Sequence, residues 1–195
     1  MKIAVATLDY LSNITNDIES ATLVGEVHIG EIVGLSLCDG LTGLFNHTYF
    51  YQQIDLEVKR FLRYGSLISL ALIDIDDFKV VNDIYGHREG DRILAAMGGR
   101  LLHLARDSDT CCRYGGEELV VILPLTDLNK AKAIANRMRE ALAEQLPDGR
   151  MVTVSIGVAT CSVNISTYQS LVEHADAALY RAKKAGKNRV MVVAR

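Results

Sequence analysis

A pair of glycines between two strand-forming runs constrains the fold of this chain more than any other feature. Residues 110–114 precede Gly115 and Gly116 and are rich in residues that favour strands, and residues 119–123 follow as an apolar, strand-like run. Both glycines can adopt positive φ without steric cost, which favours a two-residue turn between antiparallel strands. Two glutamates come directly after the turn. Bare glycines let a phosphate approach the backbone, and carboxylates are hard ligands for a divalent cation.

The size and composition indicate one domain with an additional segment. The chain has 195 residues, of which 49% are apolar, so it can bury a sizeable core. The net charge is only -3 and the basic residues form no long block, which argues against a nucleic-acid binder.

The four cysteines show no CxxC or metal-finger spacing, so we expect a reduced, cytoplasmic protein. We find no signal peptide and no apolar run of the ~18 residues that a membrane span needs. A segment cut from a longer membrane-bound sensor would look the same.

Residues 1–37 differ from the rest of the chain. Their apolar and small residues follow a 3-4 repeat, which favours an N-terminal helical stalk that pairs with a second copy. The alternatives are a helix packed on its own domain and a frayed terminus, and a glycine and a histidine in the repeat weaken the pairing. The repeat consists of Leu11, Ile14, Ile18, Ala21, Gly25, His28, Ile32 and Leu35.

Residues 38–195 predict an α/β (α+β) fold with a mixed central sheet of about five strands flanked by helices. We expect residues 78–91 to form a constrained loop or broken helix, with Asp91 as the N-cap of the next helix. The order strand, helix, hairpin, helix, strand, helix, strand contains the kernel of ferredoxin-like folds. Helices are expected over residues 48–64, 91–105, 129–145 and 168–185, and strands over residues 67–75, 151–160 and 190–193.

Acidic residues end the first predicted strand, where ligand crevices commonly open. They are Asp74, Asp76 and Asp77, and the alternative for them is a solvated turn. If this strand lies beside the hairpin, Asp74 converges with Glu117 and Glu118. Three carboxylates stay ionised cheaply only around a cation, and oxygen ligands without His or Cys favour Mg²⁺ or Mn²⁺. The pattern predicts metal-assisted phosphoryl or nucleotidyl transfer, without a P-loop because no GxxxxGK[ST] is present.

The end of the last predicted helix is strongly basic. Positive charge suits a helix C-terminus, but five basic residues are more than the helix dipole needs, so phosphate binding competes with a solvated helix end. These residues are Arg181, Lys183, Lys184, Lys187 and Arg189.

Seven motifs occur in order and at spacings that together are highly specific. They are Asp39–Asn46, Asp74–Lys79, Asn82-Asp83, Gly86-His87 with Gly90-Asp91, Arg113–Glu118, Ser155–Ala159 and Ala175–Lys183. This set resembles the GGDEF domain, the catalytic domain of bacterial diguanylate cyclases, in a GGEEL variant of the signature. The resemblance covers residues 38–195 and implies the palm-like kernel of nucleotidyl cyclases.

The resemblance also implies an activity and its catalytic groups. Two domains of a homodimer, each holding one GTP, would condense them into cyclic di-GMP and two pyrophosphates. Asp74, the Ile75 carbonyl and Glu117 would hold two Mg²⁺ (or Mn²⁺) ions per GTP. Glu118 would be a further ligand or would help to deprotonate the attacking hydroxyl, and the sequence does not separate these roles.

The implied substrate contacts lie on both sides of the hairpin. Asn82 and Asp91 would bind the guanine edge, and Asp91 is the residue expected for guanine over adenine. The glycines Gly115 and Gly116 would let the nucleotide lie against the hairpin. The residues expected along the phosphates are Phe78, Lys79, Lys183 and Lys187.

Arg106 and Asp109 match the family's RxxD product-inhibition motif. Arginine can grip a phosphate or a guanine edge with two hydrogen bonds, and aspartate can accept from guanine. Arg137 or Arg139 could supply the second arginine of such a site. The alternative is a plain Arg–Asp pair at a helix end.

Three departures from the family pattern bear on activity. Leu119 replaces the usual phenylalanine and should point into the core. Lys187 stands where arginine is common, and His47-Thr48 replaces a frequent arginine pair. The alternative function is a non-catalytic module that binds cyclic di-GMP or GTP. If the chain is a fragment, we expect a sensor or regulatory domain upstream.

Overall fold

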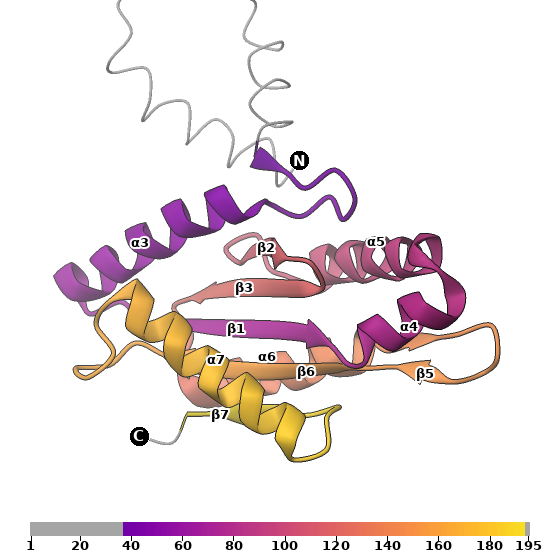
Figure 1. Cartoon of the computed structure of the whole chain (residues 1–195). Helices are drawn as coiled ribbons and strands as arrows, with labels where there is room; N and C mark the ends of the chain where they lie inside the picture. Colours follow the sequence, from indigo (N-terminus) through magenta and orange to yellow (C-terminus); the bar gives the residue numbers. More distant parts are fainter. Residues whose placement is uncertain (1–36, 194–195) are drawn as a thin grey trace, which may run out of the picture.

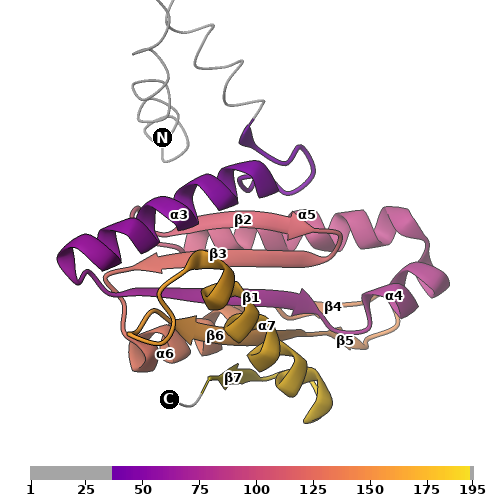
Figure 2. The same ribbon diagram turned by 60° about the vertical axis from the view of Figure 1, so that its left-hand side comes forward.

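The computed structural model describes residues 37–193, so the stalk predicted for residues 1–37 lies outside the described residues except for Leu37. Helices cover both faces of a central sheet (Figures 1 and 2). No helix in the described range is long and apolar enough to cross a membrane. In chain order the elements are α3 (His47–Tyr64), β1 (Ile68–Ile75), α4 (Phe78–Tyr85), α5 (His87–Leu104), β2 (Thr110–Gly115), β3 (Glu118–Pro124), α6 (Leu128–Ala141), β4 (Glu144–Gln145), β5 (Met151–Val152), β6 (Val154–Thr160), α7 (Tyr168–Lys184) and β7 (Val190–Val192).

The central sheet has five strands in the order β2-β3-β1-β6-β7. β1 pairs antiparallel with both β3 and β6, and β7 runs parallel to β6. The mixed α/β architecture is therefore confirmed, and β1 lies beside the hairpin as the ferredoxin-like kernel requires. All eight residues of β1 are buried because this strand is central and covered on both faces.

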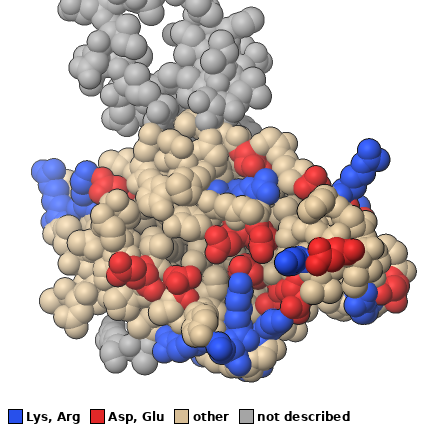
Figure 3. Space-filling view, viewed as in Figure 1, with Lys and Arg blue, Asp and Glu red and all other residues tan. Residues whose placement is uncertain are grey.

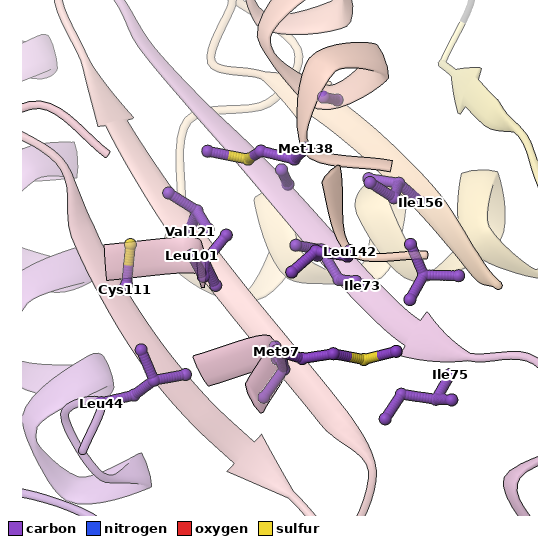
Figure 4. Packing of buried hydrophobic residues seen from close by; sticks show 14 of the residues in the cluster. Leu44, Ile73, Ile75, Met97, Leu101, Cys111, Val121, Met138, Leu142 and Ile156 are labelled. Carbon is purple, nitrogen blue, oxygen red and sulfur yellow. The ribbon is translucent and has the colours of Figure 1, made fainter. Parts of the chain in front are cut away.

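Two apolar layers hold the helices to the sheet. Residues Ile73 and Val121 face α5 and α6, where Met97 and Met138 pack against them (Figure 4). On the other face of the sheet, Leu72, which precedes Ile73 in β1, belongs to the layer under α3 and α7. This period-2 alternation divides the apolar side chains of β1 between the two layers. Leu119 is buried in the first layer, so its predicted inward position is confirmed.

A glycine sets the distance between α7 and the sheet. A Cβ at Gly157 of β6 would lie 2.1 Å from the Ala175 carbonyl oxygen and 2.3 Å from the Leu179 nitrogen. Only glycine permits so close an approach. Since α7 ends at Lys184, this contact helps to fix where the basic end of the helix meets the sheet.

The predicted N-cap at Asp91 is wrong, whereas the broken helix is observed. α4 ends before Gly86, whose φ of 81° interrupts the helical path, and α5 begins at His87. Asp91 therefore lies inside α5. A glycine with positive φ between two helical segments is a strong break, and it lies five residues before the carboxylate that we expected to start the helix.

The third predicted helix is also too long, because α6 ends at Ala141 instead of near residue 145. Glu144 and Gln145 form β4, which pairs with β5. The carboxylate of Glu144 forms ion pairs with Arg92 and Arg100 of α5. The predicted strand over residues 151–160 is divided into β5 and β6 at Thr153.

Candidate active site

The end of β1 brings three predicted site residues together. Asp74 is paired in register with Glu118 of β3, and Nζ of Lys183 on α7 lies 2.6 Å from its Oδ2. Asp74 is only 5% exposed. Burial raises the pKa of Asp74 above its ordinary value, although Lys183 opposes the shift. Figure 3 shows the molecule from the same side as Figure 1. Acidic side chains gather in the middle of the surface seen there, and basic side chains lie below them.

The other two acids predicted at the end of this strand, Asp76 and Asp77, have separate roles. Asp76 accepts hydrogen bonds from the hydroxyls of Thr153 and Ser155, both at 2.7 Å, and from the Asn188 N–H at 3.0 Å. It thereby joins β1 to β6 and to the turn before β7.

Asp77 precedes α4 with a left-handed φ of 55°, and its Oδ1 lies 2.6 Å from Nζ of Lys187. Lys187 is therefore held at the beginning of α4.

The hairpin turn lies one residue later than predicted. Gly115 still pairs with Glu118 at the end of the ladder, after an irregularity between Arg113 and Gly115. Gly116 has a positive φ of 48°, and the turn residues are Gly116 and Glu117. Glu117 thus lies at the tip and Glu118 begins β3. Burial, followed by the charge of Asp74, raises the pKa of Glu118.

A pocket of about 480 Å³ lies between the hairpin tip and helices α4 and α5, a size that suits a small ligand. Oδ1 of Asn82 is buried there and has no hydrogen-bond donor among the described residues, so it can accept from a ligand. Four lining residues had no predicted contact. Asp83, His87 and Arg113 lie in motifs that indicated a family without indicating a role for them, and Leu94 was expected only in the apolar stripe of a helix. The lining residues are Phe78, Lys79, Asn82, Asp83, His87, Asp91, Leu94, Arg113, Gly116 and Glu117.

The two glutamates of the hairpin face different hollows. Glu117 lines the pocket beside α4, whereas Glu118 lines a second hollow along α7 together with Asp176, Tyr180 and Lys183. In residues 37–193 no three His, Cys, Asp or Glu side chains are grouped closely enough to hold a metal by themselves. The structure therefore joins Asp74 to Glu118 without gathering all three predicted carboxylates into one cluster.

The donor set nevertheless fits Mg²⁺. This ion uses one or two carboxylates and completes its shell with water and substrate phosphates, so a three-carboxylate cage is not required. The carboxylate of Asp74 already contacts a cation, the Lys183 ammonium. The buried carboxylate of Asp74, with the carboxylate of Glu118 on the neighbouring strand, is thus placed to hold positive charge.

The RxxD residues lie in the turn after α5. The backbone N–H of Arg106 donates to Oδ2 of Asp109 at 2.9 Å, so the contact runs through the backbone instead of an Arg–Asp ion pair. Arg137 of α6 donates to the carbonyl of Leu104 at 3.5 Å, which places it beside this turn. Arg139 donates to Oδ1 of Asn188 at 2.6 Å and is directed elsewhere.

Comparisons with known proteins identify the family of this chain. The family model "Diguanylate cyclase, GGDEF domain" matches residues 36–189. Response regulator PleD of Caulobacter vibrioides is 42% identical over 163 residues, which cover 80% of this chain and 36% of PleD. Diguanylate cyclase A of Treponema denticola is 35% identical over 189 residues, which cover 93% of this chain and 51% of that protein. The chain thus spans about half, or less, of the length of these curated relatives.

A solved structure shares the same fold. The GGDEF domain of DgcB from Caulobacter crescentus, solved in complex with c-di-GMP, matches with a TM-score of 0.75 and 31% identity, covering 80% of this chain and 95% of that one. The family match extends over more than half of the sequence and the fold agrees with it. This chain belongs to the GGDEF domain family of diguanylate cyclases.

Proposed function

We propose that this chain is a diguanylate cyclase that condenses two GTP into cyclic di-GMP and two pyrophosphates. The observation that carries the proposal is the group formed by Asp74, Glu118 and Lys183 next to a pocket lined by the expected guanine ligands. The c-di-GMP in the DgcB structure supports the product.

Guanine selectivity follows from the pocket chemistry. Oδ1 of Asn82 accepts a hydrogen bond from the base, and the carboxylate of Asp91 accepts from the N–H groups on the guanine edge. Adenine offers no N–H donor at its ring N1, so it leaves a carboxylate unpaired. The phosphates extend along Lys79, Lys183 and Lys187, and Gly115 and Gly116 leave the backbone open to them.

The metal is Mg²⁺ or Mn²⁺, two ions per GTP, held by Asp74, the Ile75 carbonyl and Glu117. When bound by these residues, the ions would neutralise the negative charge of the phosphates. Glu118 faces the hollow along α7, apart from Glu117, and its raised pKa suits a carboxylate that accepts the proton of the 3′-hydroxyl.

One domain supplies one such site, so the reaction takes place across a homodimer. Product inhibition occurs at Arg106 and Asp109, with Arg137 as the second arginine because it lies beside their turn. The domain works in the cytoplasm and, if the chain is a fragment, under an upstream sensor or regulatory domain.

Incubation with GTP and Mg²⁺, followed by product analysis, tests the proposal. We expect cyclic di-GMP from the parent chain and none from Glu118→Ala, with GTP still bound by the variant. GTP binding by the parent without any product would support the non-catalytic module instead.

A further inference from the structure

Arg113 connects two segments that are far apart in the chain. Its Nη1 lies 3.0 Å from Oδ2 and 3.3 Å from Oδ1 of Asp39, which is 74 residues earlier. Its Nε and Nη2 donate to the Gly116 carbonyl at 3.0 and 2.8 Å. The planar guanidinium donates in two directions at fixed geometry, so it joins Asp39 to the hairpin tip rigidly.

The Asp39 loop, residues 39–46, is itself fixed. Oδ1 of Asp39 accepts from the backbone N–H and the hydroxyl of Thr42 at 2.8 and 2.7 Å. Thr42 packs on α5 at Gly98, where a Cβ would lie 2.5 Å from the Thr42 carbonyl oxygen. A loop held this closely against a long helix is a firm anchor.

Backbone hydrogen bonds extend the anchor along β2. The N–H of Phe45 donates to the Cys111 carbonyl at 3.0 Å, and the N–H of Arg113 donates to the Phe45 carbonyl at 2.8 Å. The loop thus covers part of the free edge of β2, an outer strand of the sheet. Arg113 is fixed at its backbone as well as at its guanidinium.

Arg113 lines the nucleotide pocket, yet it is poorly suited to grip a phosphate. Its charge is balanced by Asp39, and partial burial of that carboxylate, which alone would raise its pKa, is outweighed by hydrogen bonds from Thr42 and Arg113 that lower the pKa. Donors on both sides of the guanidinium are already engaged. What Arg113 does control is Gly116, whose φ of 48° shapes the turn next to Glu117.

We propose that Arg113 and Asp39 are positioning residues that hold the hairpin tip where the nucleotide and Glu117 need it. This inference rests on the proposed function. It makes the Asp39 loop, which begins two residues after Leu37, part of the active-site architecture.

Kinetics of two conservative variants test the proposal. Arg113→Lys keeps the charge but cannot donate to Asp39 and Gly116 with the same fork, and Asp39→Asn keeps the acceptor for Thr42 but loses the ion pair. We expect kcat to fall by about 10- to 100-fold, since misplacement by about 1 Å can cost 100-fold. The Mg²⁺ concentration for half-maximal rate should rise, while Lys59→Ala, which removes an exposed ion pair on α3, changes neither.

The double variant tests whether the two residues act as a unit. If they do, combining Arg113→Lys with Asp39→Asn costs little more than the worse single change. Losses that multiply, or single variants with unchanged kcat and Mg²⁺ dependence, would overturn the proposal.

Amide hydrogen exchange gives a result that does not depend on activity. In Arg113→Lys without ligand, we expect faster exchange confined to residues 115–118, with α6 unchanged. Unchanged exchange in the hairpin, or faster exchange throughout the domain, would contradict a positioning role. A parent chain that makes no cyclic di-GMP refutes the proposed function, and the exchange result still decides whether Arg113 holds the hairpin.

Discussion

The ammonium group of Lys183 lies 2.6 Å from the carboxylate of Asp74, which joins the end of α7 to the end of the central strand β1. The two residues are more than a hundred positions apart in the sequence. Because Gly157 lets α7 lie directly on β6, the lysine reaches the buried carboxylate. The ion pair therefore depends on the packing of the whole sheet layer.

Replacing Lys183 by methionine should lower kcat by about 100-fold, since the loss of one group that stabilises developing charge typically costs 100- to 1,000-fold. Methionine keeps much of the apolar stem of lysine, so the packing of α7 should change little. The matched control is Lys184→Met on the same helix, where the ammonium lies over the Tyr180 ring. Initial rates with saturating GTP measure both. An equal loss in the two variants would mean a general charge effect.

Glu118→Gln should stabilise the protein while abolishing product formation. Burial and Asp74 raise the pKa of Glu118, so its ionised form costs folding free energy at neutral pH. Glutamine keeps the shape without the charge. We expect Tm at pH 7, measured with a chelator present, to rise by about 2–4 °C, a modest gain because Glu118 remains partly in water.

The pH dependence gives the sign of this effect. A carboxyl with a raised pKa in the folded state costs stability when both states are ionised, and the cost disappears as the pH falls below the unfolded value of about 4.3. The difference in Tm between Glu118→Gln and the parent should therefore shrink from pH 7 toward pH 4. A difference that grows on acidification would show that the carboxylate is stabilising in the folded state.

The regular elements were predictable where apolar spacing decides them, as in β1 and α3. The end of α6 was not, because residues 142–145 have ordinary helix formers. It is the two arginines of α5 that bind Glu144 and favour β4 over a further helical turn. The sequence places the hairpin turn one residue too early, because Gly115 and Gly116 can both adopt positive φ. The irregularity in strand pairing between Arg113 and Gly115 puts the positive φ at Gly116.

The candidate site shows the same limit. The sequence motifs predicted Asn82 and Asp91, and both line the pocket. The separation of Glu117 from Glu118 into two hollows depends on where the hairpin meets α7, and no local pattern indicates it. The partner of Arg113 is 74 residues away, so its role required the fold.

Gly90→Ala should weaken GTP binding without destabilising the domain. A Cβ at Gly90 would lie 2.0 Å from Oδ1 of Asn82 and 3.0 Å from Cζ of Phe78, so the Asn82 amide must move. We expect GTP affinity, measured by calorimetry, to fall by about 10-fold or more, as for the loss of one good polar contact.

Gly99→Ala in the same helix is the control. No atom lies within 4 Å of a Cβ built there, and alanine is favoured over glycine in a helix by about 1 kcal/mol. It should raise Tm and leave GTP affinity unchanged. Equal affinities for the Gly90→Ala and Gly99→Ala variants would show that the position of Asn82 does not govern binding.

Arg137 and Arg139 should differ in their effect on product inhibition. Arg137 lies beside the Arg106 turn through its bond to the Leu104 carbonyl, whereas Arg139 is held by Asn188 and Glu140. Arg137→Ala should raise the cyclic di-GMP concentration for half-inhibition by about 10-fold or more, as expected for a lost charge-assisted hydrogen bond. Arg139→Ala should leave it within about twofold, and Arg106→Ala should match Arg137→Ala. Progress curves with added cyclic di-GMP measure all three, and inhibition that is lost only in Arg139→Ala would place the second arginine of the site on the other side of α6.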